Sequence, residues 1–131
     1  MKKLALILIF TLGIVAVASA DTNDTLTLEA GKQQTAKKSK LKVKFVAVTE
    51  DSRCPDGVQC IWAGNAKIKV EIIGRHGDTK TFEFNTTMGP KGDSFAGWAI
   101  NLDSLTPMPK AGQATDPKSY TAKFTITRLK R

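Results

Sequence analysis

Residues 66–73 read AKIKVEII, and this stretch decides the fold class. Ile68, Val70 and Ile72 alternate with charged residues, which would place apolar side chains on one face of an extended chain and charges on the other. Successive side chains of a β-strand point to opposite faces, so a period of two is typical of a half-buried strand. The stretch therefore predicts an antiparallel sheet whose dry face packs on another layer.

The same alternation recurs on both sides of this stretch. LKVKFVAVTE at 41–50 alternates from Leu41 to Phe45, and YTAKFTITRL at 120–129 alternates over most of its length. Shorter strand candidates are TLTLEA at 25–30, KTFEFN at 80–85 and GWAINLDSL at 97–105. No stretch after residue 20 shows the 3.6-residue repeat of an amphipathic helix, so we expect an all-β protein.

Turn-forming residues separate the predicted strands. RHGD at 75–78 lies between two of them and predicts a hairpin whose turn uses Gly77. Prolines and glycines predict longer breaks at 85–94 and 106–119. About six or seven short strands in a chain of this size favour an antiparallel β-sandwich with immunoglobulin-like proportions. A small β-barrel stays the alternative, because both folds produce the same pattern.

The first twenty residues, MKKLALILIFTLGIVAVASA, have the three parts of a secretory signal peptide. Lys2 and Lys3 precede an apolar run from Leu4 to Ala18, and small residues lead to Ala20, after which we expect cleavage. The run is shorter than the ~20 residues of a membrane span, so no transmembrane anchor is expected after cleavage. The sequence therefore predicts an exported protein, in the periplasm or outside the cell.

Residues 21–131 are predicted to form one disulfide-stapled β domain. Roughly 110 residues remain after cleavage, which is enough for one hydrophobic core but not for two. The formal net charge of the whole chain is +8. It falls to about +6 without Lys2 and Lys3, so the mature protein is moderately basic. Residues 21–24 are polar, and we expect them to be disordered before the first strand.

The two cysteines of the chain, Cys54 and Cys60, stand in the segment DSRCPDGVQCIWAG at 51–64. An isolated cysteine pair in an oxidising compartment is expected to form a disulfide. The PDG sequence at 55–57 supplies the turn residues of a short closed loop. A bridge of this size is expected to add about 2–3 kcal/mol of stability. Trp62 is expected to lie on or near it.

Metal and redox roles for these cysteines fit the sequence less well. A structural zinc site needs four ligands, whereas the chain offers two cysteines and one histidine, His76, in a different predicted turn. A thioredoxin-type site needs C-x-x-C at the start of a helix. Asp51 and Asp56 bracket the loop, but calcium takes six to eight oxygen ligands. We therefore expect no metal and no cofactor.

The cysteine segment resembles the signature S-R-C-P-x-x-V-x-C-x-W-x-G of an uncharacterised family of small secreted bacterial proteins and lipoproteins. The similarity continues into L-x-x-L-x-P-x-P at 102–109 and a Tyr-led strand at 120–124, so it spans roughly 41–128. This resemblance implies an exported, β-rich and non-enzymatic protein but no particular ligand. Many members begin with a lipidated cysteine, which this sequence lacks, so membrane tethering is not implied.

The sequence contains no pattern that indicates catalysis. Catalysis needs a poised acid, base or nucleophile held by a second group, and the single histidine, His76, falls in a predicted turn. The carboxylates available for an acid–base pair are all flanked by turn-forming residues: Asp51, Asp56, Asp93 and Asp103. Nothing selects two of them, and no phosphate-binding glycine motif is present. We therefore predict no catalytic residues and a protein that is not an enzyme.

Six lysines on two predicted strands form the first candidate binding surface: Lys38, Lys40, Lys42, Lys44, Lys67 and Lys69. The first four share one parity and therefore one predicted strand face. An exported basic face would attract anionic envelope polymers such as lipopolysaccharide, teichoic acid or acidic polysaccharide. Alternatively, outward lysines only solvate the sheet and prevent edge-to-edge association. Nucleic acid is not an expected partner, because no aromatic residues interleave with the lysines and the protein is exported.

The segment at 51–64 is the second candidate binding surface. A rigid loop loses little entropy on docking into a partner, and Arg53 and Trp62 are residue types that anchor interfaces. The alternative for Trp62 is packing in the core against the disulfide. The sequence thus predicts an exported, non-enzymatic binding or structural module of the bacterial cell envelope. It would recognise anionic envelope components through the lysines or, as an inhibitor domain does, a protein through this loop.

Overall fold

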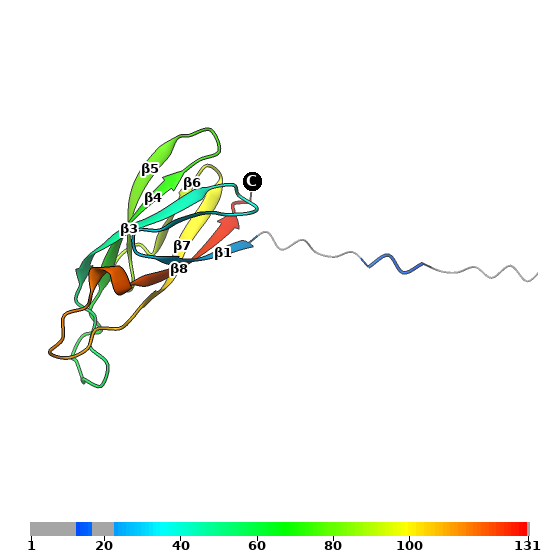
Figure 1. Cartoon of the computed structure of the whole chain (residues 1–131). Coiled ribbons are helices and arrows are strands. Elements are labelled where there is room, and N and C mark those ends of the chain that lie inside the picture. Colours follow the sequence, from blue (N-terminus) through cyan, green and yellow to red (C-terminus); the bar gives the residue numbers. More distant parts are fainter. Residues whose placement is uncertain (1–12, 17–22, 131) are drawn as a thin grey trace, which may run out of the picture.

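The computed structural model describes residues 13–16 and 23–130 (Figure 1). The signal peptide predicted for residues 1–20 lies outside the described residues except for 13–16, so its cleavage stays a prediction. The domain predicted for residues 21–131 is described from residue 23 to residue 130.

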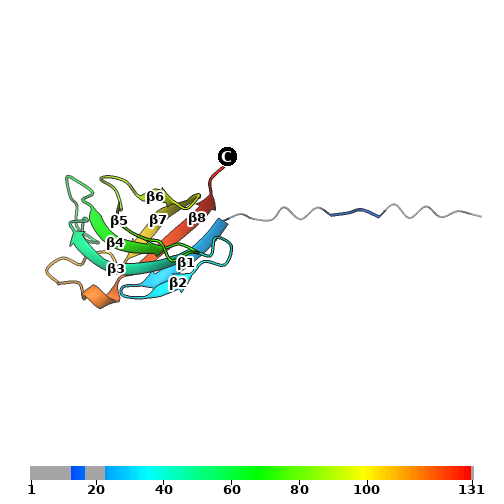
Figure 2. The same ribbon diagram turned by 90° about the horizontal axis from the view of Figure 1, so that it is seen from above.

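Eight strands and one 3-10 turn make up the regular structure of the described chain. They are β1 (Asn23–Glu29), β2 (Gln33–Thr35), β3 (Lys42–Asp51), β4 (Ala66–Ile73), β5 (Thr79–Asn85), β6 (Gly92–Phe95), β7 (Trp98–Thr106), η1 (Pro117–Ser119) and β8 (Thr121–Arg128). One antiparallel sheet has the order β1-β8-β7-β6 and the other β2-β3-β4-β5 (Figures 1 and 2). Neither sheet closes into a barrel, which confirms the β-sandwich and removes the barrel alternative.

The core is formed by the residues that alternate along the strands. In β4, Ile68, Val70 and Ile72 are fully buried, while the charged residues between them lie on the outer face. Phe45 of β3 and Phe124 of β8 come from opposite sheets and are buried as completely. Burying one such side chain stabilises the fold by about 1.5–3 kcal/mol. The period of two in the sequence therefore predicts the core correctly in both sheets.

Two short strands were not predicted by the alternation. β6 overlaps the end of the break expected at 85–94, and its residues 92–95 pair with residues 98–101 of β7. β2 pairs with the start of β3, but all its side chains are exposed. Both strands stand at the edge of a sheet and contain no buried residue. An edge strand without a buried face leaves no periodic signal in the sequence.

The start of β1 corrects a further expectation. Residues 21–24 are expected from the sequence to be disordered. Residues 21 and 22 lie outside the described residues, but β1 begins at Asn23, and Asp24 is buried. The Asp24 carboxylate accepts hydrogen bonds from the backbone N–H groups of Lys38 and Ser39 at 3.0 and 3.1 Å. A buried polar group is stable when it is hydrogen-bonded in this way. Asp24 thereby ties the first strand to the turn before β3.

The two ends of the sandwich differ in length and composition of their connections. The predicted hairpin between β4 and β5 is confirmed, with its turn at 74–78 and Gly77 at a φ of 86°. This turn, the β6–β7 turn and the end of β8 lie at one end, which we call the turn end (Figure 1). The long connections 52–65, 86–91 and 107–120 lie at the opposite end, which we call the loop end.

The strands that lead to the loop end are irregular. The pairing register shifts after Phe45 and after Val48 in β3, and after Leu102 in β7. Such β-bulges increase the local twist and redirect side chains. β6 pairs with β7 only as far as Asn101, so beyond Leu102 the only strand beside β7 among the described residues is β8. One edge of β7 is therefore uncovered by any described strand near the loop end.

Candidate functional site

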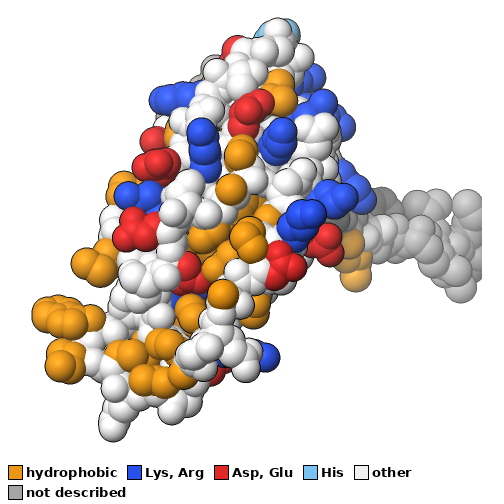
Figure 3. All heavy atoms as spheres, turned by 60° about the vertical axis from the view of Figure 1, so that its left-hand side comes forward, with side chains coloured by type: hydrophobic (Ala, Val, Ile, Leu, Met, Phe, Trp, Pro, Cys, Tyr) orange, Lys and Arg blue, Asp and Glu red, His pale blue; other side chains and the backbone are white. Residues whose placement is uncertain are grey.

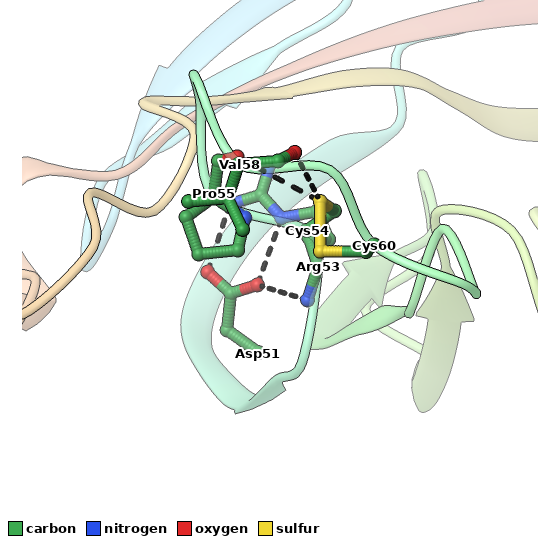
Figure 4. The surroundings of a disulfide bond; sticks show 6 residues. All are labelled: Asp51, Arg53, Cys54, Pro55, Val58 and Cys60. Carbon is green, nitrogen blue, oxygen red and sulfur yellow. Dashed lines mark hydrogen bonds and ion pairs between the residues drawn. A yellow bond between two sulfur atoms is a disulfide. The ribbon is translucent and has the colours of Figure 1, made fainter.

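Arg53 follows the end of β3, and its side chain turns back into the molecule (Figure 4). Its Nε and Nη2 donate to the two carboxylate oxygens of Asp51, each at 2.8 Å. Nη1 also donates to the carbonyl oxygen of Leu105 at 2.6 Å, and Nη2 to that of Pro107 at 2.9 Å. Only 7% of Arg53 is exposed. The residue therefore joins the end of β3 to the end of β7.

The role of Arg53 as an anchor for a partner stays a prediction, and the burial of its guanidinium does not favour it. A buried guanidinium is stable only when it is paired and hydrogen-bonded, and here those partners lie inside the molecule. The Tyr120 O–H donates to the same Asp51 carboxylate at 2.8 Å. Burial alone would raise the pKa of Asp51, but the hydrogen bonds from Arg53 and Tyr120 and the Arg53 charge outweigh it and lower this pKa. Burial and the bond to Asp51 raise the pKa of Tyr120.

The disulfide predicted between Cys54 and Cys60 is confirmed, with the two Cα atoms 5.9 Å apart. It lies within the connection 52–65, which we call the stapled loop. The backbone N–H of Asp56 donates to the carbonyl oxygen of Pro109 at 3.0 Å. The stapled loop is therefore closed by a covalent bond and attached to the connection between β7 and β8.

Gly64 closes the base of the stapled loop. Its φ is +71°, and a Cβ atom at this position would lie 1.9 Å from the carbonyl oxygen of Ser52. The Ser52 N–H donates to the carbonyl oxygen of Asn65 at 2.7 Å, so the first and last residues of the stapled loop are in direct contact. Glycine alone combines this backbone conformation with so close an approach.

Asn65 is a buried residue of the site that sequence reasoning missed. Its Nδ2 donates to Asn85 Oδ1 at 2.9 Å, and its Oδ1 accepts from the N–H groups of Thr87 and Met88 at 3.1 Å. The side chain thus attaches the connection 86–91 to the stapled loop. Its position after a glycine is the only mark in the sequence, and it is equally typical of an exposed turn residue.

Large apolar side chains gather at the loop end, where Figure 3 shows them protruding from the surface. Ile61 is 95% exposed and Trp62 is 80% exposed. The other exposed apolar residues of this region are Val58, Met88 and Met108. We call these five residues the apolar end. Core packing of Trp62, one of the two alternatives from the sequence, is wrong, because this side chain is exposed and belongs to no part of the hydrophobic core.

A cavity of about 310 Å³ opens beside the apolar end. Its lining residues are Arg53, Ala63, Thr86, Thr87, Leu102, Asp103, Ser104, Leu105 and Met108. The cavity runs along the part of β7 that β6 leaves uncovered, and Met108 belongs both to its lining and to the apolar end. The Arg53 guanidinium in its wall is already bound to Asp51 and to backbone carbonyls. The loop end thus combines an apolar rim with an adjacent hollow.

The lysines predicted to share one strand face are divided in the structure. Lys38 lies in the turn at 37–39, and Lys40 follows it with a φ of 62°, so both precede β3. Lys42 and Lys44 lie within β3 and are half-buried. The prediction of one face carrying all four lysines is therefore wrong, because the turn interrupts the period of two.

Lys67 and Lys69 lie on β4 as predicted, but glutamates accompany them. The Nζ of Lys67 is 3.9 Å from a carboxylate oxygen of Glu50 on β3. Lys69 stands directly opposite Glu83 of β5. Cross-strand pairs of opposite charge reduce the net potential of a sheet face. The outer face of this sheet is therefore mixed in charge rather than uniformly basic.

His76 is exposed in the turn between β4 and β5, and Asp56 is exposed in the stapled loop. Among the described residues, no group of three or more His, Cys, Asp or Glu side chains could hold a metal ion. No helix formed by residues 13–16 or 23–130 is long and apolar enough to cross a membrane.

Comparison with known proteins gives no further guide to the site. No family model, no curated protein and no solved structure matches the chain. The resemblance carried by the cysteine segment therefore stays a prediction.

Proposed function

We propose that this protein is an exported, non-enzymatic binding module that recognises a protein partner through its apolar end. The observation that carries the proposal is the exposure of Ile61 and Trp62, at 95% and 80%, on a loop closed by a disulfide. The same disulfide supports export, because such bonds persist mainly in oxidising compartments.

Exposure of these side chains to water is energetically unfavourable. A large aromatic side chain buries about 150–250 Å² in an interface, at about 25 cal/mol per Å² of apolar surface removed from water. Tryptophan at the centre of an interface frequently accounts for more than about 2 kcal/mol of binding energy. Trp62 and its neighbour Ile61 therefore suit a partner that presents a complementary apolar cleft.

The stapled loop is already rigid before it meets a partner. The Cys54–Cys60 bridge, the Arg53–Asp51 ion pair and the Asn65 hydrogen bonds fix it from three sides. Binding therefore restricts few additional torsion angles of the loop. Less of the binding free energy is then lost as conformational entropy. In this proposal Arg53 supports the loop, and Trp62 and Ile61 contact the partner.

The lack of charge at the apolar end favours a protein over a polyanion as its partner. The Arg53 charge is neutralised by Asp51, and the five residues of the apolar end are uncharged. Binding through this surface should depend weakly on salt, because apolar contact is not screened by ions. The lysines of β3 and β4 give weaker support for a polyanion, since Glu50 and Glu83 stand beside Lys67 and Lys69.

Photocrosslinking in the envelope of the producing cell tests this proposal. A photoreactive amino acid at Ile61 should yield an adduct of discrete mass that protease digestion destroys. The matched control carries the same photoreactive amino acid at position 123. Lys123 is exposed on β8, outside the apolar end. Replacing Trp62 by alanine in the Ile61 probe should remove the adduct, since loss of about 2 kcal/mol weakens binding roughly thirtyfold.

Two outcomes would contradict protein recognition at the apolar end. One is an adduct formed equally from positions 61 and 123, which would indicate contact without a specific surface. The other is crosslinking from position 61 to lipid alone, which would identify the apolar end as a membrane-inserting loop.

A further inference from the structure

A second cavity, of about 350 Å³, lies at the turn end of the sandwich, away from the apolar end. Three turns and the end of β8 surround it. Its lining residues are Lys38, Ser39, Arg75, Ala96, Gly97, Trp98, Arg128, Leu129 and Lys130. These residues come from four separate parts of the sequence, and the fold brings them together near the end of the described chain (Figures 1 and 2). We call this hollow the basic cavity.

All charged residues that line the basic cavity are positive: Lys38, Arg75, Arg128 and Lys130. Neither of the ion pairs between described residues, Arg53–Asp51 and Lys67–Glu50, involves Arg75, Arg128 or Lys130. The Lys38 Nζ donates to the carbonyl oxygen of Asn23 at 3.2 Å. Arg75, Arg128 and Lys130 carry like charges around one hollow and repel each other, and an anion between them would relieve that repulsion.

Two carboxylates of the described residues, Asp24 and Asp78, lie near the basic cavity. Asp24 already accepts hydrogen bonds from the backbone of Lys38 and Ser39. Asp78 lines an adjoining cavity of about 170 Å³, together with His76, Arg75 and Trp98. Even with Asp24 counted against Lys38 and Asp78 against Arg75, Arg128 and Lys130 leave an excess of positive charge among the described side chains around the basic cavity.

The cavity wall is held in place by the backbone. The β6–β7 turn consists of Ala96 and Gly97, with φ angles of 51° and 84°, as expected for a tight two-residue hairpin. The N–H of Leu129 donates to the carbonyl oxygen of Gly97 at 3.0 Å and fixes the end of β8 against this turn. Both turn residues are small, and both line the cavity.

Trp98 positions one of the four cations. The Arg128 guanidinium lies 5.9 Å from the centre of the Trp98 ring, and the two residues are directly paired between β7 and β8. A cation over an indole face is attracted by the ring electrons, and arginine keeps donors free at its edge in this arrangement. Arg128 is therefore preorganised to donate hydrogen bonds into the cavity.

We infer that the basic cavity binds a phosphate or carboxylate group, carried by a sugar-sized unit of an anionic polymer. Guanidinium groups donate paired hydrogen bonds to such oxyanions, and lysines add charge. A volume of about 350 Å³ admits more than the bare anion. This site is separate from the apolar end, so the protein has two binding surfaces at opposite ends of one domain.

The two tryptophans of the chain make this inference testable, because Trp98 lines the basic cavity and Trp62 lies at the opposite end. The experiment is an NMR titration of the purified protein at constant ionic strength, observing both indole N–H resonances. The probes are inorganic phosphate, glucose 6-phosphate, glucuronate and neutral glucose. The three anions should shift the Trp98 resonance to saturation and leave the Trp62 resonance in place, and glucose should shift neither.

Two double variants with equal changes of charge complete the design. Arg75→Gln with Lys130→Gln removes two cations from the cavity and should weaken anion binding roughly tenfold or more. Lys110→Gln with Lys118→Gln removes two exposed cations near the loop end and should leave it unchanged. The dispersion of the backbone amide spectrum checks that each variant folds, and Arg75→Gln alone provides a milder change.

Several results would overturn the inference. They are a Trp98 resonance that does not move with any anion, equal shifts with glucose, equal shifts of both indoles, or full affinity in the Arg75→Gln/Lys130→Gln variant. Comparing the sugar-linked anions with inorganic phosphate shows whether the cavity recognises the sugar as well as the anionic group. Tighter binding of glucose 6-phosphate or glucuronate than of inorganic phosphate supports a saccharide unit, whereas equal binding supports recognition of the anionic group itself.

Discussion

The guanidinium of Arg53 and the carboxylate of Asp51 form an ion pair with two parallel hydrogen bonds, each 2.8 Å long. The side chains are 5% and 11% exposed. The same guanidinium donates to the carbonyl oxygens of Leu105 and Pro107, far along the chain. This pair connects the stapled loop to β7. Arg53, which is next to the disulfide-bonded Cys54, therefore has a structural role.

Replacing Arg53 by alanine should destabilise the protein by about 3–5 kcal/mol. The change leaves the Asp51 carboxylate without its cation and two backbone carbonyls without donors, and a buried charge that loses its partner is costly. Chemical denaturation of both proteins measures the difference in free energy of unfolding. Arg75→Ala, an exposed arginine in a turn, is the control and should change it by less than about 0.5 kcal/mol. Equal effects of the two substitutions would show that Arg53 is not held as described.

The stability of the protein should fall in acid as Asp51 takes up a proton. The folded state lowers the pKa of Asp51 below its usual 3.8, so the unfolded chain binds the proton more readily. The contribution of this carboxylate is therefore complete above about pH 4 and is lost as the pH falls through the lower native pKa. Unfolding curves of wild type and Asp51→Asn between pH 2 and about pH 7 test this, because the variant should lose less stability in acid. Parallel pH profiles would contradict it.

Gly64→Ala should destabilise the protein by more than about 1 kcal/mol. A methyl group would meet the Ser52 carbonyl oxygen, and the φ of +71° is unfavourable for alanine. Gly57→Ala is the control, since its φ of +76° is similar but nothing lies within 4 Å of the added Cβ. Thermal unfolding of both variants separates the effect of the close contact from that of the backbone conformation. A Gly64 variant as stable as the Gly57 variant would refute the tight contact at the loop base.

Removing the disulfide should cost about 2–3 kcal/mol without changing the fold. The bridge closes a short loop and mainly restricts the unfolded chain. Replacing Cys54 and Cys60 together by serine should lower the melting temperature while the amide spectrum of the β-strands stays the same. The Arg53–Asp51 pair and the backbone contact at Gly64 would still hold the base of the loop. Loss of the whole fold would mean that these contacts depend on the bridge.

Local patterns in the sequence predict the sandwich well. Burial alternates residue by residue in β4, and Ile68, Val70 and Ile72 carry that signal without reference to any other strand. The disulfide is predicted from the presence of two cysteines in a chain that the sequence predicts to be exported. The sequence does not predict β2 and β6, because they have no buried residues and so show no alternation. Their formation depends on pairing with β3 and β7.

The site was harder to predict because its contacts are long-range. Arg53 looks like an interface anchor in the sequence, but the carbonyl groups that bind it are 52 and 54 residues away. The exposure of Trp62 depends on how far the stapled loop extends beyond the core. The adjacent apolar pair Ile61-Trp62, in a segment without strand alternation, is the one local signal of this surface. The basic cavity combines four separate segments and has no local signal.

Recognition through the apolar end is best tested by retention of the protein on immobilised envelope fractions at low and high salt. Wild type is compared with Trp62→Ala and with Lys42→Glu/Lys44→Glu, after each variant is shown to unfold within about 0.5 kcal/mol of wild type. Retention should persist at high salt, survive the lysine changes and disappear with Trp62→Ala. Retention that vanishes with salt or with the lysine changes, and persists in Trp62→Ala, would contradict recognition through the apolar end.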